Sequence, residues 1–172
     1  MFTRQLLILF FCFFSNLSYS NDNNQLLLND KSKKYQNIFL LTLNDKKEEL
    51  KVSKKEITIM NFWATWCPPC IKEIPQLLEI KKKYADNINL VFVTMDLNVD
   101  AVIPKFLKKY KFKKMKMYKD SQMQLSEQLG VKILPTTIIF DKNINEISRV
   151  EGLIDWLDTK NIKVIEELVN NI

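Results

Sequence analysis

Two cysteines, Cys67 and Cys70, are the residues of this 172-residue chain whose type and spacing point most directly to chemistry. An apolar, β-branched run at 57–60 precedes them and predicts a buried strand. After them, apolar residues recur at helical spacing, namely Ile71, Ile74, Leu77, Leu78 and Tyr84. The pair therefore lies where a strand turns into a helix, and the unpaired N–H groups of a helix N-terminus favour a thiolate. We expect Cys67 to be the attacking sulfur of low pKa and Cys70 to be its more buried partner.

Other functions of a close cysteine pair fit the sequence less well. A zinc ribbon requires a second cysteine pair or histidines, but the remaining cysteine is Cys12 and the chain has no histidine. A c-type haem site requires a histidine directly after the second cysteine, and Ile71 stands there. A purely structural disulfide stays open as an alternative, although so short a loop constrains the unfolded chain little.

The first twenty residues have the pattern of a secretory signal peptide. Arg4 provides a positive charge, residues 6–14 form an unbroken apolar run, and Ser18 and Ser20 are the small residues of a cleavage site. The run is shorter than the ~18–20 residues of a transmembrane helix, but an uncleaved membrane anchor stays open as an alternative. Cleavage would leave one close cysteine pair, which an exported chain uses as a dithiol or disulfide. We therefore expect a periplasmic or otherwise extracytoplasmic protein.

The rest of the sequence predicts a flexible leader followed by one α/β domain. The leader covers residues 21–36, which are polar, and the domain covers 37–172. Short strands at 38–43 and 50–52, joined by turn residues, predict an N-terminal hairpin. The other expected strands cover residues 56–64, 89–95, 112–118, 136–140 and 146–151. The expected helices cover residues 68–84, 100–110, 121–129 and a last segment that is capped by Asp158 or Thr159.

The chain is basic, with a formal net charge of +6 at pH 7. Its lysines are concentrated in one region, which contains Lys105, Lys108, Lys109, Lys111, Lys113, Lys114, Lys116 and Lys119. Since binding to nucleic acid fits poorly with export, we interpret this region as a solvated face. Docking to an acidic partner or to an anionic membrane stays open as an alternative.

The sequence around the cysteines resembles thioredoxin-fold proteins. More narrowly, it resembles the exported TlpA/ResA-like thiol:disulfide reductases, which include DsbE-type proteins. The positions that carry the resemblance are Phe62–Cys70, Glu73, Pro75, Leu134–Thr137 and Gly152, within residues 37–172. It implies a thioredoxin-like fold, in which helices flank a central mixed β-sheet. The strand and helix between Asp96 and Ser121 would be the insertion that this group adds to the minimal fold.

The resemblance also assigns roles to two residues near the cysteine pair. Asn61 takes the place where cytosolic thioredoxins carry a buried aspartate. Glu73 matches an acidic residue near the second cysteine, where it would shape cysteine titration or relay a proton to Cys70. A solvated helix glutamate is the alternative interpretation of Glu73.

Three further residues are expected to border the cysteines. The resemblance places Pro135 against the pair in a cis peptide, where it would leave backbone free for an extended substrate and exclude a metal ion. A trans proline that merely starts a strand is the alternative. Leu134 would line the substrate groove, and Trp66 would shield the rim of the active site.

The function implied by the resemblance is an exported thiol:disulfide oxidoreductase that reduces partner proteins such as apocytochrome c or copper-site proteins. The Cys67–Cys70 disulfide would be its redox group, with no other cofactor and no metal. Its partners would be disulfide-bearing proteins and a membrane electron donor of the DsbD/CcdA type, and the protein itself would be a monomer. A copper-binding metallochaperone, which would use the two soft thiolates, and a non-catalytic thioredoxin-fold binding module stay open as alternatives.

Overall fold

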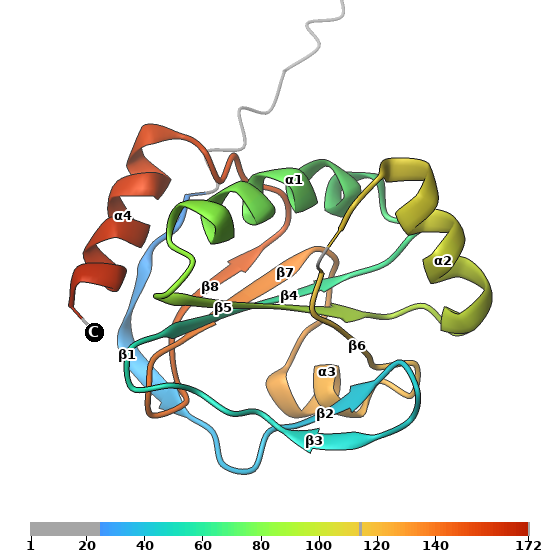
Figure 1. The fold of residues 1–172 in the computed structure, drawn as a ribbon. Coiled ribbons are helices and arrows are strands. Elements are labelled where there is room, and N and C mark those ends of the chain that lie inside the picture. The colour runs from blue at the N-terminus through green and yellow to red at the C-terminus, as the bar shows by residue number, and fades with distance from the viewer. Residues whose placement is uncertain (1–24, 114, 172) are drawn as a thin grey trace, which may run out of the picture.

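The computed structural model describes residues 25–113 and 115–171, and it shows one mixed sheet with helices on both faces (Figure 1). The strands are β1 (Leu28–Lys34), β2 (Phe39–Thr42), β3 (Lys47–Glu49), β4 (Ile57–Trp63), β5 (Ile88–Thr94), β6 (Met117–Lys119), β7 (Thr136–Phe140) and β8 (Asn145–Glu151). The helices are α1 (Pro68–Lys83), α2 (Val99–Tyr110), α3 (Gln124–Leu129) and α4 (Thr159–Asn170). The spatial order of the strands is β1-β8-β7-β4-β5-β6-β2-β3. The predicted central mixed sheet with flanking helices is therefore confirmed.

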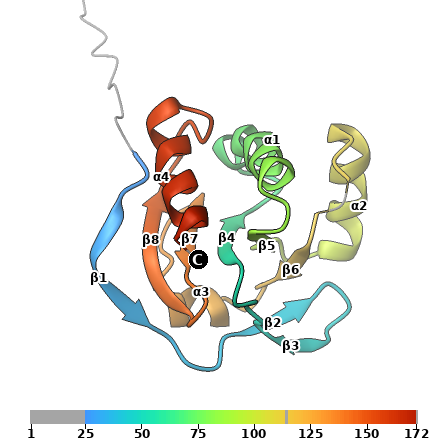
Figure 2. The ribbon, with the colours of Figure 1, turned by 60° about the vertical axis from the view of Figure 1, so that its left-hand side comes forward.

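Strand β4 lies at the centre of the sheet, and all of its side chains are buried. It pairs in parallel with β5 and antiparallel with β7. Since successive side chains of a strand point to opposite faces, Ile59 and Trp63 pack with α1 and α2, whereas Met60 and Phe62 pack with α3. Figure 2 shows α1 and α4 on one side of the sheet and α3 on the other. Asn61 shares the face of Ile59 and Trp63, which directs its side chain toward α1.

The N-terminal hairpin forms one edge of the sheet. Its second strand covers Lys47–Glu49 instead of the expected 50–52. Leu50, which follows it, is buried in the core, and its N–H donates to the carbonyl oxygen of Ile38 (2.8 Å). Strand β6 is shorter than the predicted segment 112–118, and it is an interior strand, since it pairs with β5 on one side and β2 on the other. The inserted strand therefore joins the hairpin to the central sheet.

The predicted flexible leader at 21–36 is wrong for its described part, because β1 pairs with β8 as the outermost strand of the sheet. All side chains of β1 are exposed to solvent, which is why its residues resemble those of a flexible segment. The main chain nevertheless holds it in place. The Leu26 N–H donates to Asn161 Oδ1 (2.9 Å), and the carbonyl oxygen of Leu27 accepts from Ser148 Oγ (2.6 Å).

The predicted signal peptide, or anchor, at residues 1–20 lies outside the described residues, as do the first residues of the leader. Across residues 25–113 and 115–171, no helix is both long enough and apolar enough to cross a membrane.

Docking of the N-terminal segment can be tested with two neighbouring leucines. Leu26 is 1% exposed and Leu27 is 67% exposed. We expect Leu26→Ala to lower the free energy of unfolding by about 2 kcal/mol, because it leaves a cavity in the core. Leu27→Ala should change it by no more than about 0.5 kcal/mol. Urea unfolding of both variants measures this difference, and equal effects would show that the segment is not docked.

Candidate active site

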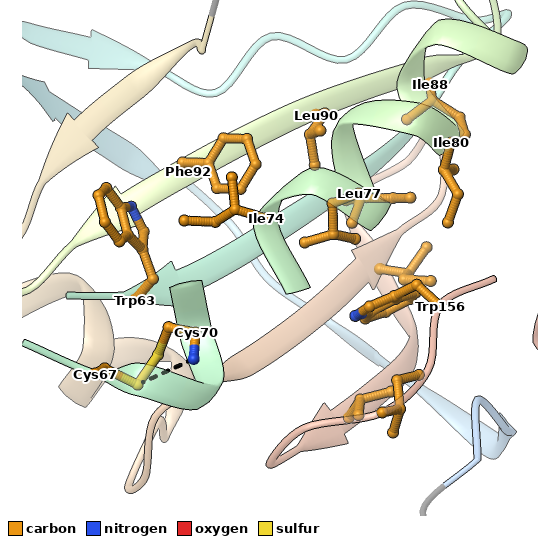
Figure 3. Packing of buried hydrophobic residues seen from close by; sticks show 14 of the residues in the cluster. Trp63, Cys67, Cys70, Ile74, Leu77, Ile80, Ile88, Leu90, Phe92 and Trp156 are labelled. Atoms are coloured by element: carbon orange, nitrogen blue, oxygen red, sulfur yellow. Dashed lines mark hydrogen bonds between the residues drawn. A yellow bond between two sulfur atoms is a disulfide. The ribbon is translucent and has the colours of Figure 1, made fainter. Parts of the chain in front are cut away.

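The cysteine pair lies where β4 passes into α1, as the sequence predicts. Cys67 is the N-cap residue of α1, and Pro68 and Pro69 occupy its first two positions. Because proline has no N–H, the first free N–H of the helix belongs to Cys70, and it donates to Cys67 Sγ (3.3 Å). The two sulfurs form a disulfide whose Cα atoms are 5.3 Å apart. Figure 3 shows this disulfide at the N-terminal end of the helix.

The two sulfurs differ in access to solvent. Cys67 is 5% exposed and lines a groove at the protein surface, whereas Cys70 is fully buried. A partner protein can therefore reach Cys67 first. In the reduced state, the Cys70 N–H and the positive end of α1 both favour a thiolate on Cys67.

The loop before the cysteines is held by Asp96, which the sequence analysis did not identify. Both Asp96 carboxylate oxygens accept hydrogen bonds from Thr65, one from its N–H (2.9 Å) and one from its hydroxyl (2.7 Å). The Thr94 hydroxyl donates to the same carboxylate (2.6 Å). Asp96 therefore ties the end of β5 to the loop that delivers Cys67. An acidic residue directly after a buried strand was the available signal.

Glu73 is completely buried one turn beyond Cys70 in α1, so the alternative of a solvated helix glutamate is wrong. Oε1 accepts from Asn61 Nδ2 (2.6 Å), and Oε2 accepts from the indole N–H of Trp156 (3.1 Å). Burial raises the pKa of Glu73 to about 7, while the hydrogen bonds from Trp156 and Asn61 act in the opposite direction. The carboxyl group can therefore gain or lose a proton near neutral pH.

Asn61 is fully buried at the face of β4 that meets α1. Its Nδ2 donates to Glu73 and also to Thr137 Oγ1 (2.9 Å) on β7. Trp156 and Thr137 complete this buried network and were not predicted, because they lie far along the chain from Glu73. In Figure 3, Trp156 lies on the same side of the sheet as α1.

The indole N–H of Trp156 can be tested with a matched substitution. We expect Trp156→Phe to raise the pKa of Glu73 above 7, because it removes a hydrogen bond that favours the carboxylate. Trp63→Phe is the control, since the indole N–H of Trp63 is buried without a hydrogen-bond partner among the described residues. A carbon-detected NMR titration of the Glu73 carboxyl group between about pH 5 and about pH 9 measures the shift. An equal shift in both variants would contradict the assignment.

Residues beside Cys67 form the active-site groove, which has a volume of about 520 Å³ and is lined by Trp66, Cys67, Met95, Leu97, Met123, Ile133 and Leu134, among others. The Leu134–Pro135 peptide is cis, in agreement with the sequence-based expectation, and the carbonyl oxygen of Pro135 accepts from the Gly152 N–H (2.8 Å). Gly152 has φ +90°, which a residue with a side chain rarely adopts. Leu134 lines the groove as predicted, and Trp66 projects at its rim with 67% of its surface exposed.

Comparison with known proteins gives a family and several relatives. The sequence profile of the thioredoxin-like family matches residues 54–146, a little over half of the chain. The thiol-disulfide oxidoreductase ResA of Bacillus thuringiensis subsp. konkukian (strain 97-27) is 32% identical over 117 residues, which cover 67% of this chain and 66% of the relative. The chain thus spans just under two thirds of that relative's length. The sporulation thiol-disulfide oxidoreductase A of Bacillus subtilis is 30% identical over 103 residues, which cover 58% of this chain and 59% of the relative.

Two solved structures share the fold. A DsbF homologue from Corynebacterium diphtheriae superposes with a TM-score of 0.68 at 23% identity, over 87% of this chain and 97% of its own. StoA from Bacillus subtilis superposes with a TM-score of 0.58 at 24% identity, over 76% of this chain and 95% of its own. These similarities confirm the predicted thioredoxin-like fold, and the ResA relatives confirm the resemblance to the ResA-like group.

Proposed function

The chain belongs to the thioredoxin-like family, and from this premise we propose that it is a thiol-disulfide oxidoreductase that reduces disulfides in partner proteins. The observation that carries the proposal is the position of Cys67, whose sulfur caps α1, lines the active-site groove and pairs with Cys70. The ResA relatives are named thiol-disulfide oxidoreductases, which supports the same class of reaction. The redox group of the proposed enzyme is the cysteine pair itself.

The proposed reaction consists of two thiol-disulfide exchanges. The Cys67 thiolate attacks one sulfur of the substrate disulfide, and the other substrate sulfur leaves as a thiolate. Cys70 then loses its proton and attacks Cys67 Sγ, which breaks the mixed disulfide and releases the second substrate thiolate. The substrate gains two electrons and becomes a dithiol, while the Cys67–Cys70 pair becomes a disulfide.

We assign the acceptance of the Cys70 proton to Glu73. The two residues are three positions apart on α1, so they occupy the same face of the helix. Cys70 and Glu73 are both buried, which keeps water away from the thiol. A group with a pKa of about 7 is well suited to accept a proton at neutral pH and to return it later.

We further propose that the protein acts outside the cytoplasm. The signal-peptide pattern of residues 1–20 supports this proposal. An exported reductase has no access to cytosolic reductants, so a membrane electron donor of the DsbD/CcdA type would regenerate the Cys67–Cys70 dithiol. The proposed substrates are the haem-attachment cysteines of an apocytochrome c or the cysteines of a copper-site protein.

Insulin reduction tests the activity. With dithiothreitol as the electron source, the purified protein should accelerate the precipitation of the insulin B chain well beyond the rate of dithiothreitol alone. A rate equal to that of dithiothreitol alone would contradict the proposed activity and would favour a non-catalytic binding module.

The N-terminus of the protein from its native host tests export. Removal of the signal peptide should leave a mature chain whose intact mass corresponds to a start at or near Asn21. A full-length chain in the membrane fraction would instead support the anchor, and a full-length chain in the cytosol would contradict export.

A further inference from the structure

A second hollow adjoins the active-site groove on the side of the N-terminal hairpin. This hairpin hollow has a volume of about 330 Å³ and is lined by Phe39, Lys47, Leu97, Lys119, Gln124 and Gln128, among others. Leu97 and Ser121 line both the hairpin hollow and the active-site groove. Leu97 is 84% exposed, so the two hollows meet at an apolar side chain that projects into solvent. A polypeptide bound at Cys67 can therefore continue across Leu97 into the hairpin hollow.

The active-site groove is suited to apolar side chains. Four of its lining residues are large, apolar and exposed, namely Trp66, Leu97, Met123 and Ile133. Exposed apolar surface that gathers at one site marks an interaction surface. Lys132 is the one charged residue among those that line this groove.

The hairpin hollow differs, because most of its lining residues are polar and its exposed unpaired charge is positive. Asp45 forms an ion pair with Lys119 (2.9 Å), and the Asp120 carboxylate accepts from the N–H groups of Leu125 (3.0 Å) and Ser126 (2.7 Å). Asp45 is therefore paired with a lysine, and the carboxylate of Asp120 keeps its charge but is buried and turned to the main chain of α3.

Lys47 is the exposed charge in this hollow that is left without a counter-ion, since Asp120 is only 5% exposed. Its ammonium group lies 4.2 Å from the centre of the Phe39 ring and forms no ion pair within the described part of the chain. The strand that carries Lys47 belongs to the main sheet, because β3 pairs with β2 and β2 pairs with β6 (Figure 1). Lys47 is thus positioned to meet an acidic side chain of a bound partner.

We propose that the substrate is an extended polypeptide with two parts, an apolar part beside its cysteine and an acidic part further along. The apolar part lies in the active-site groove, and the acidic part crosses Leu97 and lies in the hairpin hollow against Lys47. This inference deepens the proposed function and rests on it. It adds the hairpin to the surface that selects substrates.

Three peptides test the proposal. Each has one cysteine flanked by leucines, in a disulfide with thionitrobenzoate. The short peptide ends there, and the two long peptides extend it by about eight residues on each side, enough to span roughly 26 Å. One long peptide carries glutamates at both ends, and the other carries lysines. Attack by the Cys67 thiolate forms the Cys67–peptide disulfide and releases thionitrobenzoate, whose absorbance gives the second-order rate constant for the pre-reduced protein.

The wild-type protein is expected to react at least about tenfold faster with the glutamate peptide than with the lysine peptide. Lys47→Glu should abolish or reverse this preference and leave the rate with the short peptide unchanged. Lys54→Glu is the matched control, since it makes the same charge change just before β4, at the end of that strand opposite Cys67. It should retain most of the preference.

Two outcomes would overturn the proposal, namely no preference in the wild-type protein, or an equal loss of preference in Lys47→Glu and Lys54→Glu. The short peptide separates this failure from a failure of the proposed function. If the short peptide reacts and insulin is reduced, the oxidoreductase activity stands and the inferred substrate class alone is wrong. If neither reaction occurs, the proposed function fails as well.

Discussion

Cys67→Ser is expected to abolish insulin reduction and to leave only the rate of dithiothreitol alone. The reaction needs a thiolate that a partner can reach, and Cys67 is the sulfur of the pair that lines the active-site groove. Cys70 cannot take over this role, because it is fully buried. Its sulfur also lies further into α1, away from the capping position that favours an anion. Insulin turbidity measures the loss directly.

Cys70→Ser is the companion variant, because it retains the attacking sulfur and removes the resolving one. It should accumulate mixed disulfides with substrate proteins, which mass spectrometry of captured complexes can identify. The roles of the two cysteines can also be checked in the reduced wild-type protein. If iodoacetamide modifies Cys70 before Cys67 at neutral pH, the assignment of Cys67 as the nucleophile is wrong.

The free energy of unfolding of Glu73→Gln, compared with that of the wild-type protein, is expected to rise by about 3 kcal/mol between about pH 4.5 and about pH 7. Burial raises the pKa of Glu73 from 4.5 to about 7, so the folded protein retains a proton over a range in which the unfolded chain releases it. The stability of the wild-type protein therefore falls as the pH rises from about 4.5 to about 7, and this contribution is constant at higher pH. Glutamine does not titrate and removes this dependence.

Urea unfolding of the oxidised protein at several pH values measures this difference. At low pH the variant should be the less stable protein. The amide nitrogen of glutamine cannot accept a hydrogen bond from Asn61 Nδ2 or Trp156 Nε1, whereas the hydroxyl oxygen of a protonated carboxyl group still can. Glu79→Gln, on the exposed side of α1, is the matched control for loss of a carboxyl group. If the two variants differ from the wild-type protein by the same amount at every pH, Glu73 is not a buried titrating group.

The parts of the site that the sequence predicts are those set by local patterns. The apolar run before Cys67 and the helical spacing after Cys70 place the pair between β4 and α1, and the structure agrees to within a few residues. Leu134 and Pro135 were located by their position directly before a buried strand, within a recognised motif. Their place in the chain follows from local pattern, whereas the resemblance assigned Leu134 to the groove and Pro135 to a cis peptide beside the cysteines.

Strand β1 shows where composition misleads. Its side chains are exposed and, apart from Leu28, polar, so nothing in its pattern distinguishes it from a flexible leader. Its place at the edge of the sheet depends on main-chain hydrogen bonds to β8 and on the buried anchors Leu26 and Tyr35 at its two ends. Main-chain groups are the same in every residue, so their partners cannot be read from residue types.

For Glu73, the sequence determined the position in the helix, and the tertiary structure decided the environment of the carboxyl group. Helical periodicity placed this carboxyl group one turn beyond Cys70, and the resemblance assigned it a role in cysteine titration or proton relay. Its burial, its two hydrogen-bond donors and its pKa of about 7 depend on Asn61 from β4 and on Trp156 after β8. These residues meet only when the sheet, α1 and the segment before α4 pack together. The pKa was therefore decided by the tertiary structure, because packing removes water from the carboxylate and no local pattern can do so.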